Sequence, residues 1–314
     1  ERVDKLVPYG FVDTQISTFH AFGDRLLRDY AIEIGLPANF KILNKTEQLI
    51  FMRQNIFAFD LNYYRPISNP TSHIDALIGH FSRLKDELIS EEDYSKYSEN
   101  LLREAKTDEE ILEAEKTREL SGAFSRYRSL MSEAGNLDYG DQIFLAHKLL
   151  KDNPVIRKES QKKFKYILVD EFQDTNYGQN ELVKLIAKEH QNITVVGDDD
   201  QSIYRFRGAS ISNIMNFKKA FPFAKTIVLN QNYRSTQEIL DCSYNLIQNN
   251  NPNRLEYQEK VNKKLISSHR GPIPELLFCQ NLSQEADIVA KKITELKNTG
   301  LNYRDFAILV RANN

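Results

Sequence analysis

The chain has 314 residues, of which 41% are hydrophobic and 27% are charged, and its formal net charge is -2. This length suits about two domains of 100–200 residues, and the apolar content excludes a globally disordered chain. A net charge this close to zero excludes a uniformly basic nucleic-acid binder, so any such surface must be local. The two cysteines lack metal-ligand spacing, and no apolar run reaches the roughly 18 residues of a membrane span. We therefore expect a cytoplasmic protein without a disulfide framework.

The first third of the chain is predicted to be mainly helical. Residues 1–5 lack the layout of a signal peptide and are typical of the middle of a helix, so we expect the chain to begin inside a domain. A short strand is predicted over 15–17, followed by a helix that carries Phe22, Leu26 and Leu27. Over residues 30–135 apolar side chains recur at three- and four-residue spacing without a strand pattern, which predicts an all-helical insertion.

Short apolar strands alternate with amphipathic helices beyond residue 136. The predicted strands cover residues 164–169, 193–196, 226–229, 275–279 and 306–310, and the predicted helices cover 181–188, 211–221, 238–247 and 285–296. This alternation predicts an α/β fold with a parallel sheet covered by helices on both faces. In such sheets, ligands gather at the carboxyl ends of the strands. We expect one domain from residues 1–29 and 136–228, the insertion over 30–135, and a second domain over 229–314.

Two adjacent carboxylates, Asp170 and Glu171, follow the first of these strands. Phosphoryl transfer requires one carboxylate to help hold Mg²⁺ and another group to orient or deprotonate the attacking water. Asp170 suits the first role and Glu171 the second. Acidic residues often follow a strand without a chemical role, and this interpretation would be favoured for an isolated Asp-Glu pair. The continuation Phe-Gln-Asp-Thr over residues 172–175 makes the functional interpretation stronger.

The segment 195–209 follows the second predicted strand and mixes polar with aromatic residues. Its three successive aspartates at 198–200 suit a helix cap or a calcium site, but the rest of a calcium-loop pattern is missing. The uncharged side chain of Gln201 could form a hydrogen bond with a phosphate or with an attacking water. Tyr204 and Phe206 alternate with arginines that include Arg207, a mixture suited to stacking on bases and neutralising phosphates. In isolation, ordinary packing would be the favoured explanation for these aromatic residues.

A third polar segment, residues 228–236, places Tyr233 and Arg234 just past a predicted strand. A surface arginine is usually only solvated, so this segment alone gives a weak functional signal.

Together these segments resemble the motifs of the UvrD/Rep/PcrA group of superfamily 1 helicases. Residues 16–22 are similar to motif Ib, 170–175 to the Walker B motif, 197–209 to motif III and 231–236 to motif IV; residues 307–313 resemble the strand that follows motif IV. The matches occur in the order of the family. The resemblance implies RecA-like P-loop NTPase motor domains that bind ATP between them and grip single-stranded DNA.

The resemblance assigns a role at the nucleotide site to each of five residues. Asp170 would coordinate Mg²⁺, and Glu171 would be the general base for hydrolysis. Gln201 would link the γ-phosphate to the DNA-binding residues. Tyr233 would lie against the adenine, and Arg234 would be the arginine finger, which contributes about 10³–10⁵ in rate in other nucleotide hydrolases.

The resemblance also assigns DNA contacts. Thr18 and His20 would touch the DNA backbone, whereas Tyr204, Phe206 and Arg207 would contact bases and phosphates. Close relatives commonly have Trp at the position of Phe206, and Phe offers a smaller surface for stacking.

The family's phosphate-binding loop, G-x-x-x-x-G-K-[ST], does not occur in the chain, which contains no Gly-Lys dipeptide. We expect a first motor domain truncated at its N-terminus, its insertion, and the beginning of a second motor domain, with negligible ATP hydrolysis by this chain alone. The complete protein is expected to be a nucleoid-associated helicase of DNA repair or replication. It would translocate 3′ to 5′ on single strands and unwind single-strand/duplex junctions. The alternatives are a non-catalytic DNA-binding or regulatory relative and the motor part of a helicase–nuclease.

Overall fold

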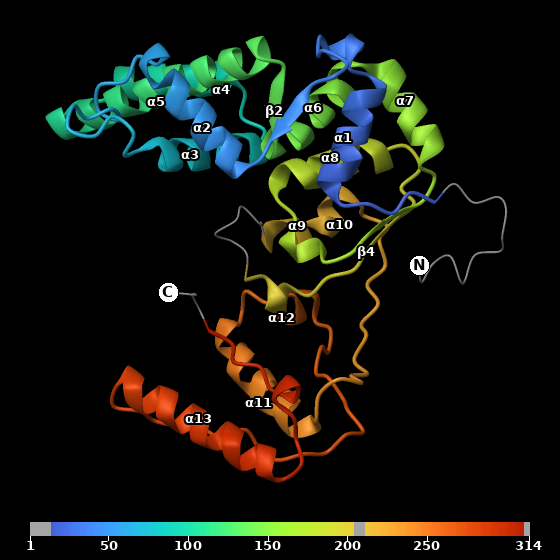
Figure 1. Cartoon of the computed structure of the whole chain (residues 1–314). Coiled ribbons are helices and arrows are strands. Elements are labelled where there is room, and N and C mark those ends of the chain that lie inside the picture. The colour runs from blue at the N-terminus through green and yellow to red at the C-terminus, as the bar shows by residue number, and fades with distance from the viewer. Residues whose placement is uncertain (1–13, 204–210, 311–314) are drawn as a thin grey trace. The chain divides into compact units, whose positions relative to one another are not determined.

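The computed structural model describes residues 14–203 and 211–310 (Figure 1). The chain divides into two compact units, residues 1–226 (unit 1) and residues 227–314 (unit 2), which are described here one at a time. No helix in the described part of the chain is long and apolar enough to cross a membrane.

Within its described residues, unit 1 is helix-rich and contains two short pairs of strands. Its elements in chain order are α1 (Phe19–Asp29), β1 (Lys41–Leu43), α2 (Lys45–Asn55), α3 (Ile74–Asp86), α4 (Glu91–Glu104), α5 (Asp108–Glu133), β2 (Asn136–Asp138), α6 (Tyr139–Asp152), α7 (Pro154–Lys163), β3 (Ile167–Val169), α8 (Tyr177–Ala187), β4 (Ile193–Val195), α9 (Ile211–Met215) and α10 (Phe217–Ala220). The predicted helix over 211–221 is thus interrupted at Asn216, and residues 15–17 form no strand.

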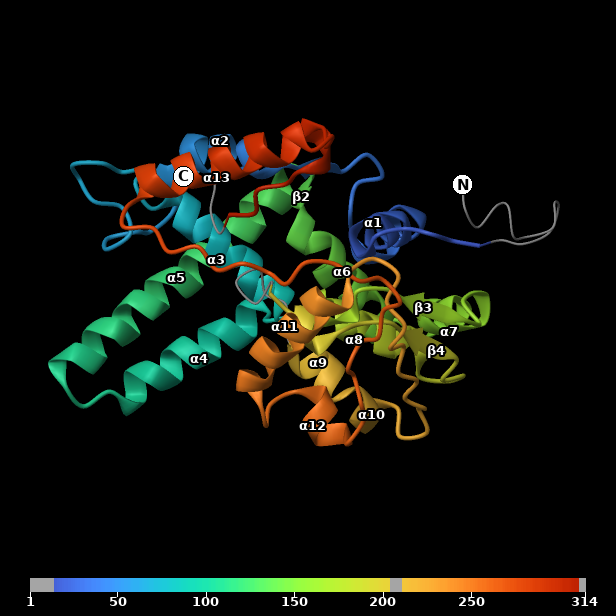
Figure 2. The ribbon, with the colours of Figure 1, turned by 90° about the horizontal axis from the view of Figure 1, so that it is seen from below.

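The region between α2 and α5 has its own hydrophobic core. Phe81, Phe124 and Tyr127 are among its fully buried side chains, and their rings lie 5.3–5.5 Å apart, centroid to centroid, around Phe81. Capping boxes at Asn44, Ser90 and Thr107 fix where α2, α4 and α5 begin, because each satisfies backbone N–H groups that the first helical turn leaves unpaired. Helices α4 and α5 pack against each other along the hairpin seen in Figure 2.

Strand β1 lies inside the region predicted to be entirely helical, so that prediction is wrong at this point. Lys41–Leu43 pairs in parallel with Asn136–Asp138, which follows the helical region. Three residues are too few to show the alternation of a strand, and the Asn44 cap of α2 follows immediately. The sequence pattern therefore showed only the helices on either side.

Strands β3 and β4 form the second parallel pair, with Ile167 opposite Ile193 and Val169 opposite Val195. Val169 packs with Phe172 of the following turn and Val183 of α8, so helix α8 covers one face of this pair. Leu168 points to the other face and is 78% exposed. Among the residues that the structure describes, the sheet is therefore not covered on both faces, in contrast to the prediction.

A buried ionic cluster joins α3 to β2 and α6. The ammonium of Lys85, fully buried, lies 2.7 Å from Asp138 Oδ2 and 2.8 Å from Asp141 Oδ1. The Tyr127 hydroxyl donates a hydrogen bond to Asp138 Oδ2 at 3.0 Å. Burial alone would lower the pKa of Lys85, but the two carboxylates outweigh it and raise that pKa. Lys85 therefore stays charged, and the cluster connects the helical region to the α/β region.

Unit 2 consists of α11 (Gln237–Ile247), α12 (Leu255–Glu259) and α13 (Leu282–Asn298) with connecting segments. The strands predicted over 226–229, 275–279 and 306–310 do not form; within the described residues this unit has an isolated parallel bridge between Gln231 and Ile266. A strand needs a neighbour to satisfy its N–H and C=O groups. Phe278 and Leu309 are accordingly exposed, and the prediction of these three strands is wrong for the structure as described.

Candidate nucleotide and DNA site

The turn after β3 carries the two carboxylates singled out by the sequence. Asp170 and Glu171 are exposed, and Asp170 Oδ1 accepts a hydrogen bond from the backbone N–H of Glu171 at 3.0 Å. Glu171 has φ 48° and ψ 45°, in the left-handed region, and a 3₁₀ turn over Phe172–Asp174 follows. Such a backbone costs a residue other than glycine about 1–3 kcal/mol and persists where surrounding contacts determine it. The turn therefore presents both carboxylates to solvent at the carboxyl end of β3.

Gln173 links this turn to the segment after β4. Its side chain is 1% exposed; Nε2 donates to Glu171 Oε2 at 2.7 Å, and Oε1 accepts from the backbone N–H of Asp198 at 3.1 Å. A Cβ at Gly197 would lie 2.7 Å from Gln173 Oε1, so the close approach requires glycine there. The sequence analysis did not single out Gln173, because its second partner is 25 residues away.

Gln201 lies on a 3₁₀ turn, Asp199–Gln201, just beyond the end of β4. Its Nε2 donates to Asp198 Oδ2 at 2.9 Å, and Asp198 Oδ1 accepts from the backbone N–H of Asp200 at 3.2 Å. Within unit 1 the structure thus brings Glu171 and Gln201 into one hydrogen-bonded chain that runs through Gln173 and Asp198. The carboxylates of residues 198–200 lie within 4.8 Å of one another, but the Asp198 carboxylate serves as the cap of this turn.

Asn213 of α9 attaches the other end of the same segment to the β3 turn. Its Nδ2 donates to the carbonyl oxygens of Thr175 and Asn176 at 2.9 and 3.1 Å, and its Oδ1 accepts from Asn180 Nδ2 at 3.1 Å. Asn176 in turn donates through Nδ2 to Asp86 Oδ1 at the end of α3, at 2.7 Å. Burial, followed by the nearby carboxylates of Glu87 and Asp138, raises the pKa of Asp86 to about 7. The β3 turn is therefore also connected to the helical region.

The two residues at the start of α1 that were predicted to contact DNA also have local structural roles. Thr18 is exposed and caps α1, with Oγ1 accepting from the backbone N–H of Ala21 at 3.3 Å. The ring of His20 meets the ring of Tyr139 edge to face at 6.0 Å, and burial lowers the pKa of His20. Tyr139 is half-exposed, and it was not singled out because a lone Tyr at a helix start carries no pattern. The other three predicted DNA contacts, Tyr204, Phe206 and Arg207, lie outside the described residues.

Tyr233 and Arg234 belong to unit 2 and are described within that unit alone. Asn232 Oδ1 accepts hydrogen bonds from the backbone N–H groups of Arg234 and Ser235 at 2.9 and 2.8 Å, which forms a tight turn. Tyr233 is 79% exposed, and Arg234 is exposed as well. The turn thus presents an aromatic ring and a guanidinium side by side in sequence and open to solvent.

The donor groups after β3 and β4 suit Mg²⁺ and a triphosphate. Mg²⁺ keeps several waters and is usually held by one or two carboxylates together with substrate phosphates, rather than by a complete protein cage. Asp170, an exposed carboxylate at the end of a strand, matches this need. The exposed amide of Gln201 can donate to a phosphate oxygen or orient a water.

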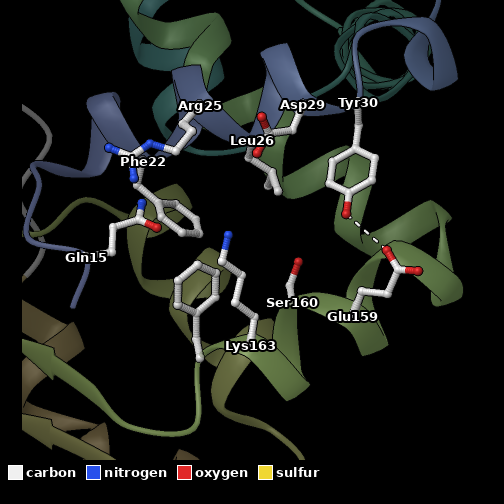
Figure 3. A pocket seen from close by; sticks show the side chains of 10 residues that line it. Gln15, Phe22, Arg25, Leu26, Asp29, Tyr30, Glu159, Ser160 and Lys163 are labelled. Carbon is white, nitrogen blue, oxygen red and sulfur yellow. Dashed lines mark hydrogen bonds between the residues drawn. The ribbon is translucent and has the colours of Figure 1, made fainter. Parts of the chain in front are cut away.

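Two pockets of unit 1 lie apart from these groups. The pocket in Figure 3 lies between α1 and α7, encloses about 70 Å³, and is lined by Arg25, Lys163 and the hydrogen-bonded pair of Tyr30 and Glu159. It is too small for a nucleotide, since ligand pockets usually enclose about 300–1,000 Å³. A larger pocket of about 380 Å³ is formed by α2, α3 and the start of α6, and Tyr139 lies on its wall.

Comparison with protein families identifies the chain. Residues 1–222 match the UvrD/REP helicase N-terminal domain, and residues 227–314 match the UvrD-like helicase C-terminal domain. The chain belongs to the UvrD/REP helicase family. This membership confirms the resemblance drawn from the motifs and implies a RecA-like α/β fold. The helix-rich structure of this UvrD/REP chain and the short parallel strand pairs of unit 1 are consistent with that fold.

The UvrD/REP relatives include proteins named ATP-dependent DNA helicase PcrA. The chain is 36% identical to that of Bacillus subtilis (strain 168) over 317 residues, which cover all of this chain and 39% of the relative. It is 34% identical to that of Leuconostoc citreum over 305 residues (96% of this chain, 37% of the relative) and 35% identical to that of Staphylococcus aureus (strain Mu50) over 313 residues (100% and 39%). The chain thus spans less than two fifths of the length of these relatives.

Proposed function

We propose that this chain carries part of the motor of an ATP-dependent DNA helicase. The complete gene product would couple ATP hydrolysis to 3′-to-5′ movement on single-stranded DNA and to unwinding at single-strand/duplex junctions, in repair or replication. The main support is the hydrogen-bonded chain from Glu171 through Gln173 and Asp198 to Gln201, which joins the ends of two parallel strands. Plain DNA binding does not need such an arrangement, so it favours a motor over a non-catalytic relative.

In this proposal the residues after β3 and β4 act on ATP and water. Asp170 holds Mg²⁺, which when bound neutralises charge on the phosphates. Glu171 accepts a proton from the attacking water, and Gln201 contacts the γ-phosphate. Tyr233 packs against the adenine, and Arg234 stabilises charge on the transferred phosphoryl group. The exposure of these five side chains leaves each of them accessible to a ligand.

The proposed DNA surface combines backbone contacts with stacking. Thr18 and His20 contact the DNA backbone, and the half-exposed ring of Tyr139 beside His20 extends this surface. Because burial keeps the pKa of His20 below its ordinary value of 6.5, the ring is neutral at physiological pH and acts through hydrogen bonding. Further stacking and phosphate contacts are assigned to Tyr204, Phe206 and Arg207. Such contacts weaken with salt and tolerate any base sequence.

The proposed organisation keeps the division made from the sequence. Residues 1–29 and 136–228 form the first motor domain, residues 30–135 its insertion, and residues 229–314 the beginning of the second motor domain. A cytoplasmic, nucleoid-associated location accords with action on DNA.

The decisive experiment is a DNA-dependent ATPase and unwinding assay of the complete gene product. We expect ATP hydrolysis to be stimulated by single-stranded DNA, and Glu171→Gln to lower turnover by about 10²–10⁴-fold, as loss of a general base does. Binding of a fluorescent ATP analogue should be retained. The matched control is Glu181→Gln on α8, which removes a carboxylate paired with Lys184 and should leave turnover unchanged.

Turnover that survives Glu171→Gln would contradict the general-base assignment. The 314-residue chain alone should hydrolyse ATP negligibly, because it contains no Gly-Lys of a phosphate-binding loop. Hydrolysis by this chain at the rate of the complete gene product would contradict that expectation.

A further inference from the structure

Helix α7 and the two residues that follow it form a strongly basic segment in a chain whose net charge is -2. Residues 154–165 contain five cations and one carboxylate, that of Glu159. Arg157 is used within the protein, because Nη1 donates to the carbonyl oxygens of Leu150 and Lys151 at 3.0 and 3.1 Å. The other four cations are exposed lysines, which we call the α7 lysine patch: Lys158, Lys162, Lys163 and Lys165.

We propose that the α7 lysine patch binds the phosphate backbone of a DNA segment that lies outside the proposed single-strand track. This inference goes beyond the proposed function, and only the choice of DNA as the polyanion rests on it. A local cluster of cations is the electrostatic feature that nucleic-acid binding requires, even where the whole chain is nearly neutral. Because phosphates carry no sequence information, the patch should accept DNA of any sequence.

The lysines of the patch lack the carboxylate partners that other surface lysines of unit 1 have. On the neighbouring helix α6, Lys148 lies 2.9 Å from Asp152. In the part of the chain that the structure describes, no such ion pair involves a lysine of the patch. Glu159, the one carboxylate of the segment, instead accepts a hydrogen bond from the Tyr30 hydroxyl at 3.0 Å. The patch therefore keeps a net positive charge for an external anion.

The helix dipole accounts for only part of this charge. Cations in the last turn of a helix are favourable, and this effect suffices for Lys162 and Lys163. Lys158 lies in the middle of α7 and Lys165 lies beyond its end, where the dipole gives no comparable advantage. Because Lys158 and Lys162 are four positions apart, they share one face of the helix. The patch is thus a stripe of charge along an exposed face, as contact with a polyanion requires.

The pocket between α1 and α7 lies beside the patch and offers a defined place for one phosphate group (Figure 3). The Lys163 ammonium and the Ser160 hydroxyl point into it, and Arg25 lines it from α1. Its volume of about 70 Å³ is roughly that of two water molecules at about 30 Å³ each, which leaves room for phosphate oxygens. The carboxylates of Asp29 and Glu159 also line the pocket, so the place for an anion is next to Lys163.

The patch is separate from both sites of the proposed function. Lys165 precedes β3 and Asp170 follows it, so the two lie at opposite ends of that strand. On α1, His20 lies two positions before Phe22 of the pocket, which places it about 200° around the helix. A strand held at Thr18 and His20 therefore leaves the pocket face of α1 uncovered. A different segment of DNA is needed to reach the patch.

The main test replaces Lys158, Lys162 and Lys165 together with glutamine in the complete gene product. Each lysine that contacts a phosphate adds about one to the slope of log affinity against log salt concentration. We expect this slope to fall by about three for a blunt duplex or a long dT strand, and affinity at low salt to fall by about ten-fold or more. A dT oligonucleotide of about ten nucleotides, which the proposed track alone can hold, should bind within about two-fold of wild type.

The matched control replaces Lys96, Lys106 and Lys116 with glutamine, which removes the same total charge from the α4–α5 hairpin. Lys116 Nζ there lies 2.7 Å from Glu113, among many other carboxylates. The salt slope of this variant should be unchanged on every DNA. The replaced side chains are exposed or half-exposed in both variants, so circular dichroism should show the same unfolding midpoint as for wild type. An equal fall of the slope in both variants would reveal a general charge effect and contradict the proposal.

Glu159→Gln should have the opposite effect to removal of the lysines. It deletes the one carboxylate between residues 154 and 165 and keeps an oxygen that accepts from the Tyr30 hydroxyl. We expect affinity for the DNA that the patch binds to rise by about two- to five-fold, a gain that partial unfolding cannot produce. Lys163→Gln, tested alone, should lower the salt slope by about one.

The DNA affected by the triple substitution identifies the form that the patch binds. A loss on the blunt duplex assigns it to double-stranded DNA, and a loss on the long dT strand alone assigns it to a single strand; both support the proposal. Unchanged affinity for both would overturn it, and an equal loss on the short oligonucleotide would place the lysines in the track. The proposal also fails if the substitution abolishes binding to phosphatidylserine vesicles and spares DNA. Failure of the wild type to bind the short oligonucleotide would instead contradict the proposed function.

Discussion

The two parallel strand pairs of unit 1 each end in carboxylates, yet those carboxylates have opposite surroundings. After β2, Asp138 and Asp141 are buried and share the ammonium of Lys85. After β3, Asp170 and Glu171 are exposed; Asp170 accepts a hydrogen bond from a backbone N–H, and Glu171 accepts one from the Gln173 amide. The first pair shares one cation inside the protein, whereas the hydrogen-bond partners just named for the second pair include no cation.

This contrast shows that carboxylates at the end of a strand do not by themselves indicate a ligand site. Burial with an internal cation makes such a group structural, because an unpaired buried charge would be too costly. Exposure next to a strained turn leaves the group able to bind a metal ion or a water. The contrast predicts that the buried cluster matters for stability and the exposed pair for chemistry.

Removal of the buried cation should have the largest effect on stability. Lys85→Met leaves Asp138 and Asp141 without their ammonium, so we expect the free energy of unfolding to fall by about 3–5 kcal/mol. Urea unfolding followed by circular dichroism measures this loss. The control is Lys148→Met, which removes an exposed pair with Asp152 and should cost less than about 1 kcal/mol. Equal losses in the two variants would contradict the structural role of the buried cluster.

Asp86 accepts a hydrogen bond from Asn176 beside the β3 turn and is also influenced by the charge of Asp138. Its substitution should have an intermediate, pH-dependent effect on the free energy of unfolding. Its pKa rises from an ordinary 3.8 to about 7, so ionisation opposes folding increasingly as pH rises through this range and constantly above it. Asp86→Asn removes the charge and keeps an acceptor for Asn176. Because the side chain is only partly buried, we expect a gain of about 1–2 kcal/mol at about pH 8 that disappears near pH 4. A gain that is equal at both pH values would argue against ionisation as its cause.

The smallest effect on stability is expected at the proposed general base. Glu171 is exposed, and glutamine there keeps an oxygen that accepts from Gln173, so Glu171→Gln should change the free energy of unfolding by less than about 0.5 kcal/mol. Asp138→Asn, measured by the same urea unfolding, should cost several times more because Lys85 loses a partner. Comparable losses in both variants would remove the distinction between the two clusters.

Sequence patterns located the β3 and β4 strands and the polar residues after them, because buried strands are continuous apolar runs and the family motifs are specific. They could not locate contacts between distant residues. Lys85 and Asp138 are 53 positions apart, and Gln173 and Asp198 are 25 apart, so neither pairing leaves a periodic trace. The strand β1 was missed because its three residues are too few to show the alternation of a strand.

In unit 2 the error was the opposite one, because strands were predicted that do not form among the described residues. Residues 226–229, 275–279 and 306–310 have the apolar character of buried strands, but a strand forms only when a neighbouring strand accepts its hydrogen bonds. Apolar character is a property of the residues themselves, whereas pairing depends on the rest of the sheet. The two longer helices of the same unit, α11 and α13, were predicted well in outline because their hydrogen bonds are internal, whereas the short α12 was not predicted.

The connection between β4 and α9 is fastened to the 172–176 turn at both of its ends. Gln173 holds Asp198 near one end, and Asn213 holds Thr175 and Asn176 near the other. Tension on this connection therefore reaches the turn at two separate points. Two attachments oppose rotation more than one does, so the turn should translate as a unit under tension.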